Sequence, residues 1–103
     1  MSGYKIIETG DVDKEHAIGN SAKWITTVVQ FSKSYNLKSP IVLFSIRNLM
    51  IDNTNLFDHT PFAYIGRIYD DHDGFQFNIN FGEIVTYTTS ITYSLYYCLI
   101  DKI

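Results

Sequence analysis

Cysteine is almost absent from this sequence. Cys98 is the only one, so the chain cannot close an intrachain disulfide, and no oxidising compartment is implied. The first residues lack the apolar run of a signal peptide, and Ser2 stands where myristoylation requires glycine. No apolar stretch comes near the roughly 20 residues that a membrane-spanning helix needs. We therefore expect a cytoplasmic protein that does not enter a membrane.

Clustered positive charge is also missing. The eight lysines and arginines stand singly along the chain, and the 11 acidic residues bring the net charge to −3. Non-specific binding to nucleic acid requires clustered Lys and Arg that displace counterions, and binding to anionic lipid requires a similar cluster. The charge pattern therefore argues against DNA, RNA and membranes as partners. It favours a protein partner with a basic surface.

The linear motifs of common enzymes are absent. The sequence has no Gly-x-Ser-x-Gly, no Walker phosphate loop and no Gly-x-Gly-x-x-Gly. The acidic segment 70–74 matches a calcium loop only in part, because Tyr69 and Asn80 stand at the end positions where carboxylates are required. We expect no enzyme activity, no cofactor and no metal site. A working pair of carboxylates leaves no linear signature, so a carboxylate-based active site stays open.

Aromatic residues are abundant, at 16% of the chain, with eight tyrosines, seven phenylalanines and one tryptophan. A core of this size needs fewer, so some of the tyrosines are expected at the surface, where Tyr gives a large contact area. Alanine is scarce, while isoleucine and asparagine are plentiful. That bias is typical of an AT-rich coding sequence and is consistent with a phage or mobile-element accessory protein.

The first half of the chain predicts a short strand and a helix. Tyr4–Glu8 is expected to be a strand, ended by Thr9-Gly10 and an acidic turn at 11–13. Asp13–Asn36 has helical periodicity, split at Gly19 and capped at Asn20 or Ser21. Its apolar side consists of Trp24, Ile25, Val28, Val29, Phe31 and Tyr35. The β-branched run 25–29 is also compatible with a strand, but the periodicity predicts a helix.

The second half predicts strands. Pro40–Ile51 is expected to be a strand covered on both sides, followed by a turn-rich loop at 52–61. Phe62–Tyr69 and Phe75–Phe81 predict a β-hairpin with an acidic tip at 70–74. In its second strand the apolar residues alternate with amides and should face the core. These apolar residues are Phe75, Phe77, Ile79 and Phe81.

The last segment, Ile84–Ile100, alternates apolar and hydroxyl side chains and predicts a strand with a bend near Thr89-Ser90. A helix capped at Ser90 is the alternative, because it would place apolar residues on one face. The β-branched and aromatic composition favours the strand. The predicted fold is therefore a single α+β domain over residues 1–103, with one main helix packed on an antiparallel sheet of five or six strands.

Two functions fit these features. The first is a small acidic protein that docks on a macromolecular partner and inhibits or modulates it. The second is a domain that captures a small, nucleotide-like ligand at an interface of a homo-oligomer. The candidate contact residues lie at the hairpin tip and in the last strand. They are Tyr69, Asp70, Asp71, His72, Asp73, Tyr93 and Tyr96.

Overall fold

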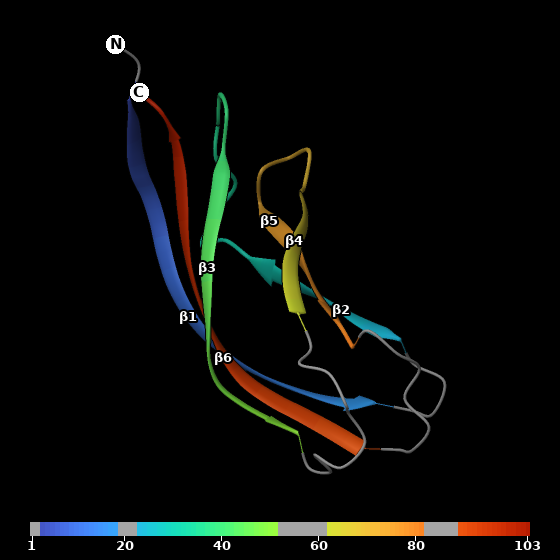
Figure 1. Cartoon of the computed structure of the whole chain (residues 1–103). Helices are drawn as coiled ribbons and strands as arrows, with labels where there is room; N and C mark the ends of the chain where they lie inside the picture. The colour runs from blue at the N-terminus through green and yellow to red at the C-terminus, as the bar shows by residue number, and fades with distance from the viewer. Residues whose placement is uncertain (1–2, 19–22, 52–61, 82–88) are drawn as a thin grey trace.

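The computed structural model describes residues 3–18, 23–51, 62–81 and 89–103. All regular secondary structure in these ranges is β-strand (Figure 1). The strands are β1 (Tyr4–Ile18), β2 (Trp24–Gln30), β3 (Ile41–Ile51), β4 (Phe62–Ile68), β5 (Gly74–Asn80) and β6 (Thr89–Lys102). None of the described segments is a helix long and apolar enough to cross a membrane.

The six strands form two antiparallel sheets of three strands each, in the orders β1-β6-β3 and β2-β5-β4. The sheets face each other, and the start of β1 lies beside the end of β6 at one end of the first sheet (Figure 1). There the amide of Ile103 donates a 3.0 Å hydrogen bond to the carbonyl of Gly3. The α+β prediction is therefore wrong, since the described residues contain no helix and the strands are divided between two sheets.

The core lies between the two sheets. The inner face of β5 supplies side chains that are fully or almost fully buried, as the alternation predicted. Aromatic contacts join the sheets, with Phe75 and Tyr97 ring centroids 5.4 Å apart and those of Phe77 and Tyr93 6.0 Å apart. The β6 residues that face this core are Ile91, Tyr93, Leu95, Tyr97 and Leu99. A sandwich of this kind needs no helix to cover either inner face.

The predicted helix over Asp13–Asn36 is replaced by the end of β1, by β2 and by an extended loop. β2 pairs with β5 without a register shift, from Trp24 opposite Asn80 to Gln30 opposite Gly74. The β-branched run in the middle of β2 suits this pairing, because such side chains pack well on a pleated surface. The predicted split and cap at residues 19–21 lie outside the described residues.

The acidic segment at 11–13 is part of β1 and is not a turn. Asp11 and Asp13 are exposed, while Val12 between them is half-buried and packs against the core. The three residues pair in register with Tyr96, Leu95 and Ser94 of β6. Outward-facing carboxylates on an edge strand stay hydrated, so their charge is compatible with a strand.

The strand predicted at Pro40–Ile51 is confirmed as β3, but its predicted burial on both faces is wrong. β3 is an edge strand, and its outward residues Ile41 and Leu43 are exposed. The last segment is a strand over Thr89–Lys102, so the helical alternative is wrong for these residues. The loop predicted at 52–61 and the segment at 82–88 lie outside the described residues.

Asp101, buried on β6, fixes the loop that crosses from β2 in one sheet to β3 in the other. Its carboxylate accepts hydrogen bonds from the amides of Lys38, at 2.9 Å, and Ser39, at 2.7 Å. Burial would raise the pKa of Asp101, but the backbone hydrogen bonds outweigh it and lower the pKa. The end of the loop is therefore held in place for the start of β3.

Candidate binding face

The outer face of the β2-β5-β4 sheet brings together aromatic and amide side chains from three strands. The register aligns them in three rows across the sheet. The rows are Trp24–Asn80–Phe62, Thr26–Asn78–Tyr64 and Val28–Gln76–Arg67. We call these residues the aromatic face.

The apolar members of the aromatic face are strongly exposed. Trp24 and Phe62 each expose 57% of their surface, Val28 47% and Tyr64 42%. The Phe62 and Tyr64 rings stack at 6.1 Å between centroids with an angle of 28°. Single exposed apolar residues are ordinary, whereas several on one face are typical of binding surfaces. Trp and Tyr are also the residues that most often dominate binding energy.

The centre of the aromatic face is polar. The Thr26 hydroxyl donates a 2.8 Å hydrogen bond to Oδ1 of Asn78, which is only 7% exposed. β4 has a register irregularity between Ile65 and Arg67 that leaves Gly66 beside these amides. A Cβ at Gly66 would collide with Gln76 Oε1 and lie 2.6 Å from Asn78 Nδ2. The glycine therefore gives both carboxamides room to lie over β4.

The hairpin tip adjoins one end of the aromatic face. Its turn is closed by hydrogen bonds from the Tyr69 amide to the Gly74 carbonyl and from the His72 amide to the Tyr69 carbonyl, at 3.0 and 2.9 Å. A shallow hollow of about 620 Å³ joins tip and face. It is lined by Val28, Gln30, Arg67, Tyr69, Asp70, Asp71, Asp73 and Gly74. The predicted tip residues other than His72 thus line one surface.

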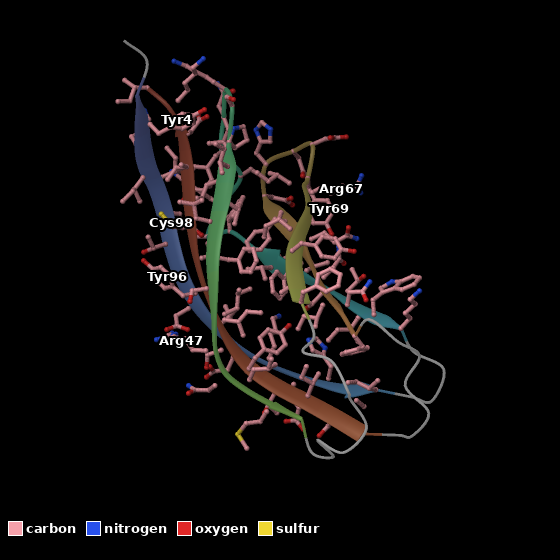
Figure 2. The ribbon with its side chains drawn as sticks, viewed as in Figure 1. Tyr4, Arg47, Arg67, Tyr69, Tyr96 and Cys98 are labelled. Atoms are coloured by element: carbon pink, nitrogen blue, oxygen red, sulfur yellow. The ribbon has the colours of Figure 1, made fainter. Side chains whose placement is uncertain are left out.

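The acidic charges at the tip interact with one another. A hydrogen bond with Asp71 raises the pKa of Asp73, and burial and the negative charge of Asp71 act in the same direction. The Arg67 guanidinium lies 5.1 Å from the centre of the Tyr69 ring, where cation–π attraction holds it (Figure 2). A cationic group from a partner would relieve the repulsion between the carboxylates.

His72 has a structural role at the tip. Its carbonyl accepts a hydrogen bond from the Tyr35 amide at 3.2 Å, and its Nδ1 accepts one from the Leu37 amide at 3.3 Å. The amide of Phe31 also donates to the carbonyl of Asp73, at 2.8 Å. The tip backbone therefore holds the loop after β2, while the three aspartate side chains remain at the surface.

The two tyrosines predicted in the last strand do not join the tip. Tyr93 is buried in the core, where its hydroxyl lies 3.0 Å from Nε2 of His16 and burial raises its pKa to about 12. Tyr96 is exposed on the outer face of the other sheet. Figure 2 shows it on the opposite side of the molecule from Arg67 and Tyr69. The structure thus divides the predicted contact residues among the tip, the core and the far face.

Sequence reasoning missed the three exposed aromatic residues of this face. The helical periodicity predicts Trp24 on the apolar side of a helix. Phe62 and Tyr64 alternate with Ala63 and Ile65, which pack against the core. That alternation was a usable signal, because alternate side chains of a strand point to opposite faces, so one of the two pairs must face outward. The alternation could not identify the outward-facing pair, since both pairs are apolar.

A second polar cluster surrounds Glu8 on the other sheet. The carboxylate accepts hydrogen bonds from the hydroxyls of Ser32 and Tyr35, both at 2.5 Å, and of Tyr97 at 2.6 Å. The Tyr97 ring can lie there because Gly10 opposite has no side chain. Burial would raise the pKa of Glu8, but the hydrogen bonds outweigh it and lower the pKa to about 2. A carboxylate so firmly ionised is a poor proton carrier and acts as a structural anchor.

Within the described ranges, no group of three or more His, Cys, Asp or Glu side chains could hold a metal ion. Cys98 is a half-buried free thiol. Comparison of the chain with protein-family models, with curated proteins and with solved structures finds no match.

Proposed function

We propose that this chain is a non-enzymatic binding protein that docks through the aromatic face on a macromolecular partner and inhibits or modulates it. The observation that carries the proposal is the exposure of Trp24, Val28, Phe62 and Tyr64 on one face of a three-stranded sheet. Covering these side chains removes apolar surface from water, which is the main driving force of protein association.

The partner that fits is a protein with an apolar surface bordered by basic residues. The aromatic face supplies apolar side chains around a polar centre, and the carboxylates of the acidic tip lie at its border. Such an arrangement keeps charge out of the buried centre while the border charges speed the encounter. The net charge of −3 opposes a nucleic-acid partner. We place this interaction in the cytoplasm, because the only cysteine forms no disulfide within the chain.

The first prediction concerns the aromatic face. Trp24→Ala, Phe62→Ala and Tyr64→Ala should each weaken the complex by about tenfold or more, as truncated hot-spot residues do. The partner is captured from host lysate with the tagged chain and then purified, and dissociation constants are measured by calorimetry. Leu43→Ala is the control, because Leu43 is 54% exposed on the outer face of the other sheet.

Capture of a protein is not sufficient support by itself. The proposal fails if the three aromatic variants bind the purified partner as tightly as the parent chain. It also fails if Leu43→Ala weakens binding as much as they do. If the lysate yields no protein and a small metabolite remains bound, capture of a small ligand replaces docking as the function.

The second prediction concerns the acidic tip. Changing Asp70, Asp71 and Asp73 together to asparagine should slow association and flatten its dependence on salt, because the steering field is reduced. The thermal midpoint should change little, since charges on an exposed loop contribute little to stability. Association rates are measured by stopped flow at low and high salt.

The matched control for the tip removes the same number of charges elsewhere. Asp11→Asn, Asp13→Asn and Glu15→Gln together alter the exposed outer side of β1, in the other sheet. If this control slows association as much as the tip variant, net charge alone is responsible. The tip would then not lie at the border of the interface.

A further inference from the structure

The outer face of the β1-β6-β3 sheet carries a second exposed apolar surface. Ile6 on β1 is 68% exposed, and Leu43 on β3 is 54% exposed. Figure 2 shows Tyr4, Cys98 and Tyr96 along this side of the molecule. Several exposed apolar side chains on one face are typical of a binding surface. We call the rows Ile6–Ile100–Ile41, Thr9–Cys98–Leu43 and Asp11–Tyr96–Ser45 the outer patch.

The centre of the outer patch is hollowed. The hollow has a volume of about 310 Å³ and is lined by Leu43, Phe44, Ser45, Tyr96 and Cys98. Ser45 contributes only a short side chain to this lining. Ile41, four residues earlier on the same strand, points outward and is exposed. The patch therefore has both a projecting apolar side chain and a hollow that a side chain of that kind can enter.

The two ends of this face carry opposite charges. The exposed lysines at the end where β6 finishes are Lys5, Lys38 and Lys102. The exposed acidic side chains farther along β1 are Asp11, Asp13 and Glu15. Arg47 pairs with Asp11 and so offsets only one of these three carboxylates. The face therefore has a basic end and an acidic end, with most of its apolar side chains between them.

These charges decide how two copies of the face can lie against each other. With parallel strands the two acidic ends would meet, and like charges brought together oppose association. With antiparallel strands and Cys98 opposite Cys98 of the second copy, residues at equal distances on either side face each other. Lys102 is four residues after Cys98 and Ser94 is four before it, so Lys102 lies opposite the row that holds Ser94 and Asp13. Each acidic end then meets the basic end of the other copy.

The antiparallel arrangement also matches apolar side chains to hollows. Leu43 is in the row of Cys98 and therefore lies opposite Leu43 of the second copy. Ser45 is two residues after Leu43 and Ile41 is two before it, so Ile41 of the second copy lies over Ser45 and the hollow. A two-fold axis repeats every contact, so both hollows are filled together.

We infer that two copies of this chain form a two-fold symmetric dimer through their outer patches, with antiparallel strands and Cys98 beside the axis. Covering the patch removes exposed apolar side chains from water, which drives the association. The contact area of a few short rows is small for a protein interface, so we expect a dissociation constant on the order of micromolar.

The dimer gives the protein two docking surfaces. The outer patch and the aromatic face lie on opposite sides of the sandwich, because they are the outer faces of its two sheets (Figure 1). In the dimer the two aromatic faces therefore point in opposite directions. A partner that carries several copies of its binding site is then held more tightly than by one face. This consequence rests on the proposed function, whereas the dimer itself is tested on the chain alone.

Sedimentation velocity of the chain alone tests the dimer. The parent chain should change from monomer to dimer over the micromolar range. Leu43→Glu and Ile6→Glu should each weaken self-association by about tenfold or more, because each places a charge in the covered patch. Phe62→Glu is the matched control, since Phe62 is similarly exposed on the aromatic face, and it should self-associate like the parent. The thermal midpoints of all three variants should stay close to that of the parent.

Two sedimentation results would contradict the dimer. One is a parent chain that stays monomeric at about 1 mM. The other is self-association that Phe62→Glu abolishes and the two outer-patch variants leave unchanged. Ile6 and Leu43 lie on different strands, so one variant still decides the question if the other fails to fold.

Crosslinking through Cys98, the only cysteine, locates the axis. Packed sheets lie about 10 Å apart, so the facing thiols of the dimer are within reach of an ethylene-bridged bismaleimide. The parent should form a covalent dimer, which Leu43→Glu should prevent and Phe62→Glu should not. In a dimer paired edge to edge through β3, the thiols would lie side by side about 14 Å apart, three strand spacings, and beyond that reach. A parent that dimerises without crosslinking would refute the face-to-face arrangement.

Exchange of two charges tests the direction of the strands. Lys102→Glu and Asp13→Lys should each weaken the dimer by about fivefold, since each adds repulsion between the two copies. The two substitutions together should restore self-association toward the parent value, because opposite charges face each other again. Sedimentation velocity compares the four chains at low salt. If the combined variant self-associates no more tightly than the single variants, the antiparallel arrangement is wrong.

Discussion

Replacing Phe77 by alanine is expected to lower the free energy of unfolding by about 3–5 kcal/mol, the usual cost of deleting a buried phenyl ring. Phe77 is completely buried on the central strand β5. Its ring centroid lies 5.2 Å from that of Phe44 on β3 and 6.0 Å from that of Tyr93 on β6. The substitution therefore leaves a cavity between the two sheets that neither sheet can close alone.

The expected thermal effect is large for a chain of this size. At about 4–8 °C per kcal/mol for small domains, the midpoint should fall by at least 12 °C or so. Because small domains have only about 5–15 kcal/mol of stability, part of the variant can be unfolded at 37 °C. Urea and thermal unfolding followed by circular dichroism measure the change.

Phe62→Ala is the matched control for Phe77→Ala. It is the same chemical change on the adjacent strand, at a side chain that is 57% exposed. Its effect on stability should stay within about 0.5 kcal/mol, although it should weaken partner binding as described above. Equal destabilisation by the two substitutions would mean that the face of β4 assigned to solvent is packed.

Glu8→Gln is expected to have the second-largest effect on stability. The carboxylate accepts hydrogen bonds from three hydroxyls and also from the Ser32 amide, at 3.0 Å. A neutral amide offers one acceptor oxygen where the carboxylate offers two, so at least one hydroxyl loses the oxygen to which it donates. We expect a loss of about 1–3 kcal/mol, toward the lower end because the cluster is partly exposed to solvent.

The control for Glu8→Gln is Glu15→Gln. Glu15 lies on the same strand and is exposed, so its substitution should change the unfolding free energy by less than about 0.5 kcal/mol. Urea unfolding at neutral pH compares the two variants with the parent chain. If both variants are equally stable, the hydrogen bonds around Glu8 contribute nothing beyond a surface charge.

The same cluster predicts an acid-dependent loss of stability. The pKa of Glu8 is about 2 in the folded protein, against 4.5 for the free side chain. A folded-state pKa below the unfolded one means that the unfolded chain binds the proton more tightly. The stabilisation from Glu8 is therefore fully present above pH 4.5 and disappears as the pH falls from 4.5 toward 2.

A comparison of two chains isolates the contribution of Glu8. The pKa of Asp101 is also lowered in the folded protein, so protonation of Asp101 at low pH reduces the stability of the fold as well. Because Glu8→Gln leaves Asp101 in place, the stability difference between parent and variant should shrink as the pH falls from 6 to 2. A difference that stays constant over this range would show that Glu8 is not ionised preferentially in the folded state.

The most local patterns were predictable from the sequence. The alternation from Phe75 to Phe81 depends only on the two-residue period of a strand, so it identified the buried face of β5 before any partner strand was known. The hairpin tip was also predictable, because Asp and Gly supply turn geometry by themselves. The same reasoning placed the tip carboxylates at the surface.

The helix predicted over Asp13–Asn36 shows where local patterns are insufficient. β2 carries apolar side chains on both faces, since Val29 enters the core while Trp24 and Val28 lie on the aromatic face. A strand that is apolar on both sides has no clean two-residue alternation, so its residues can also be grouped on a helical wheel. These residues form a strand because they pair with β5, and this pairing depends on contacts between residues that are far apart in the sequence.

The sequence by itself determined the acidic charge, the buried face of β5 and the hairpin with its tip, because each depends on composition or on neighbouring residues. Only the tertiary structure decided that Trp24, Phe62 and Tyr64 share an exposed face and that Tyr93 is in the core. The packing of the two sheets around one core determines which apolar residues stay exposed to water. The spacing of apolar residues along a single strand cannot predict that packing.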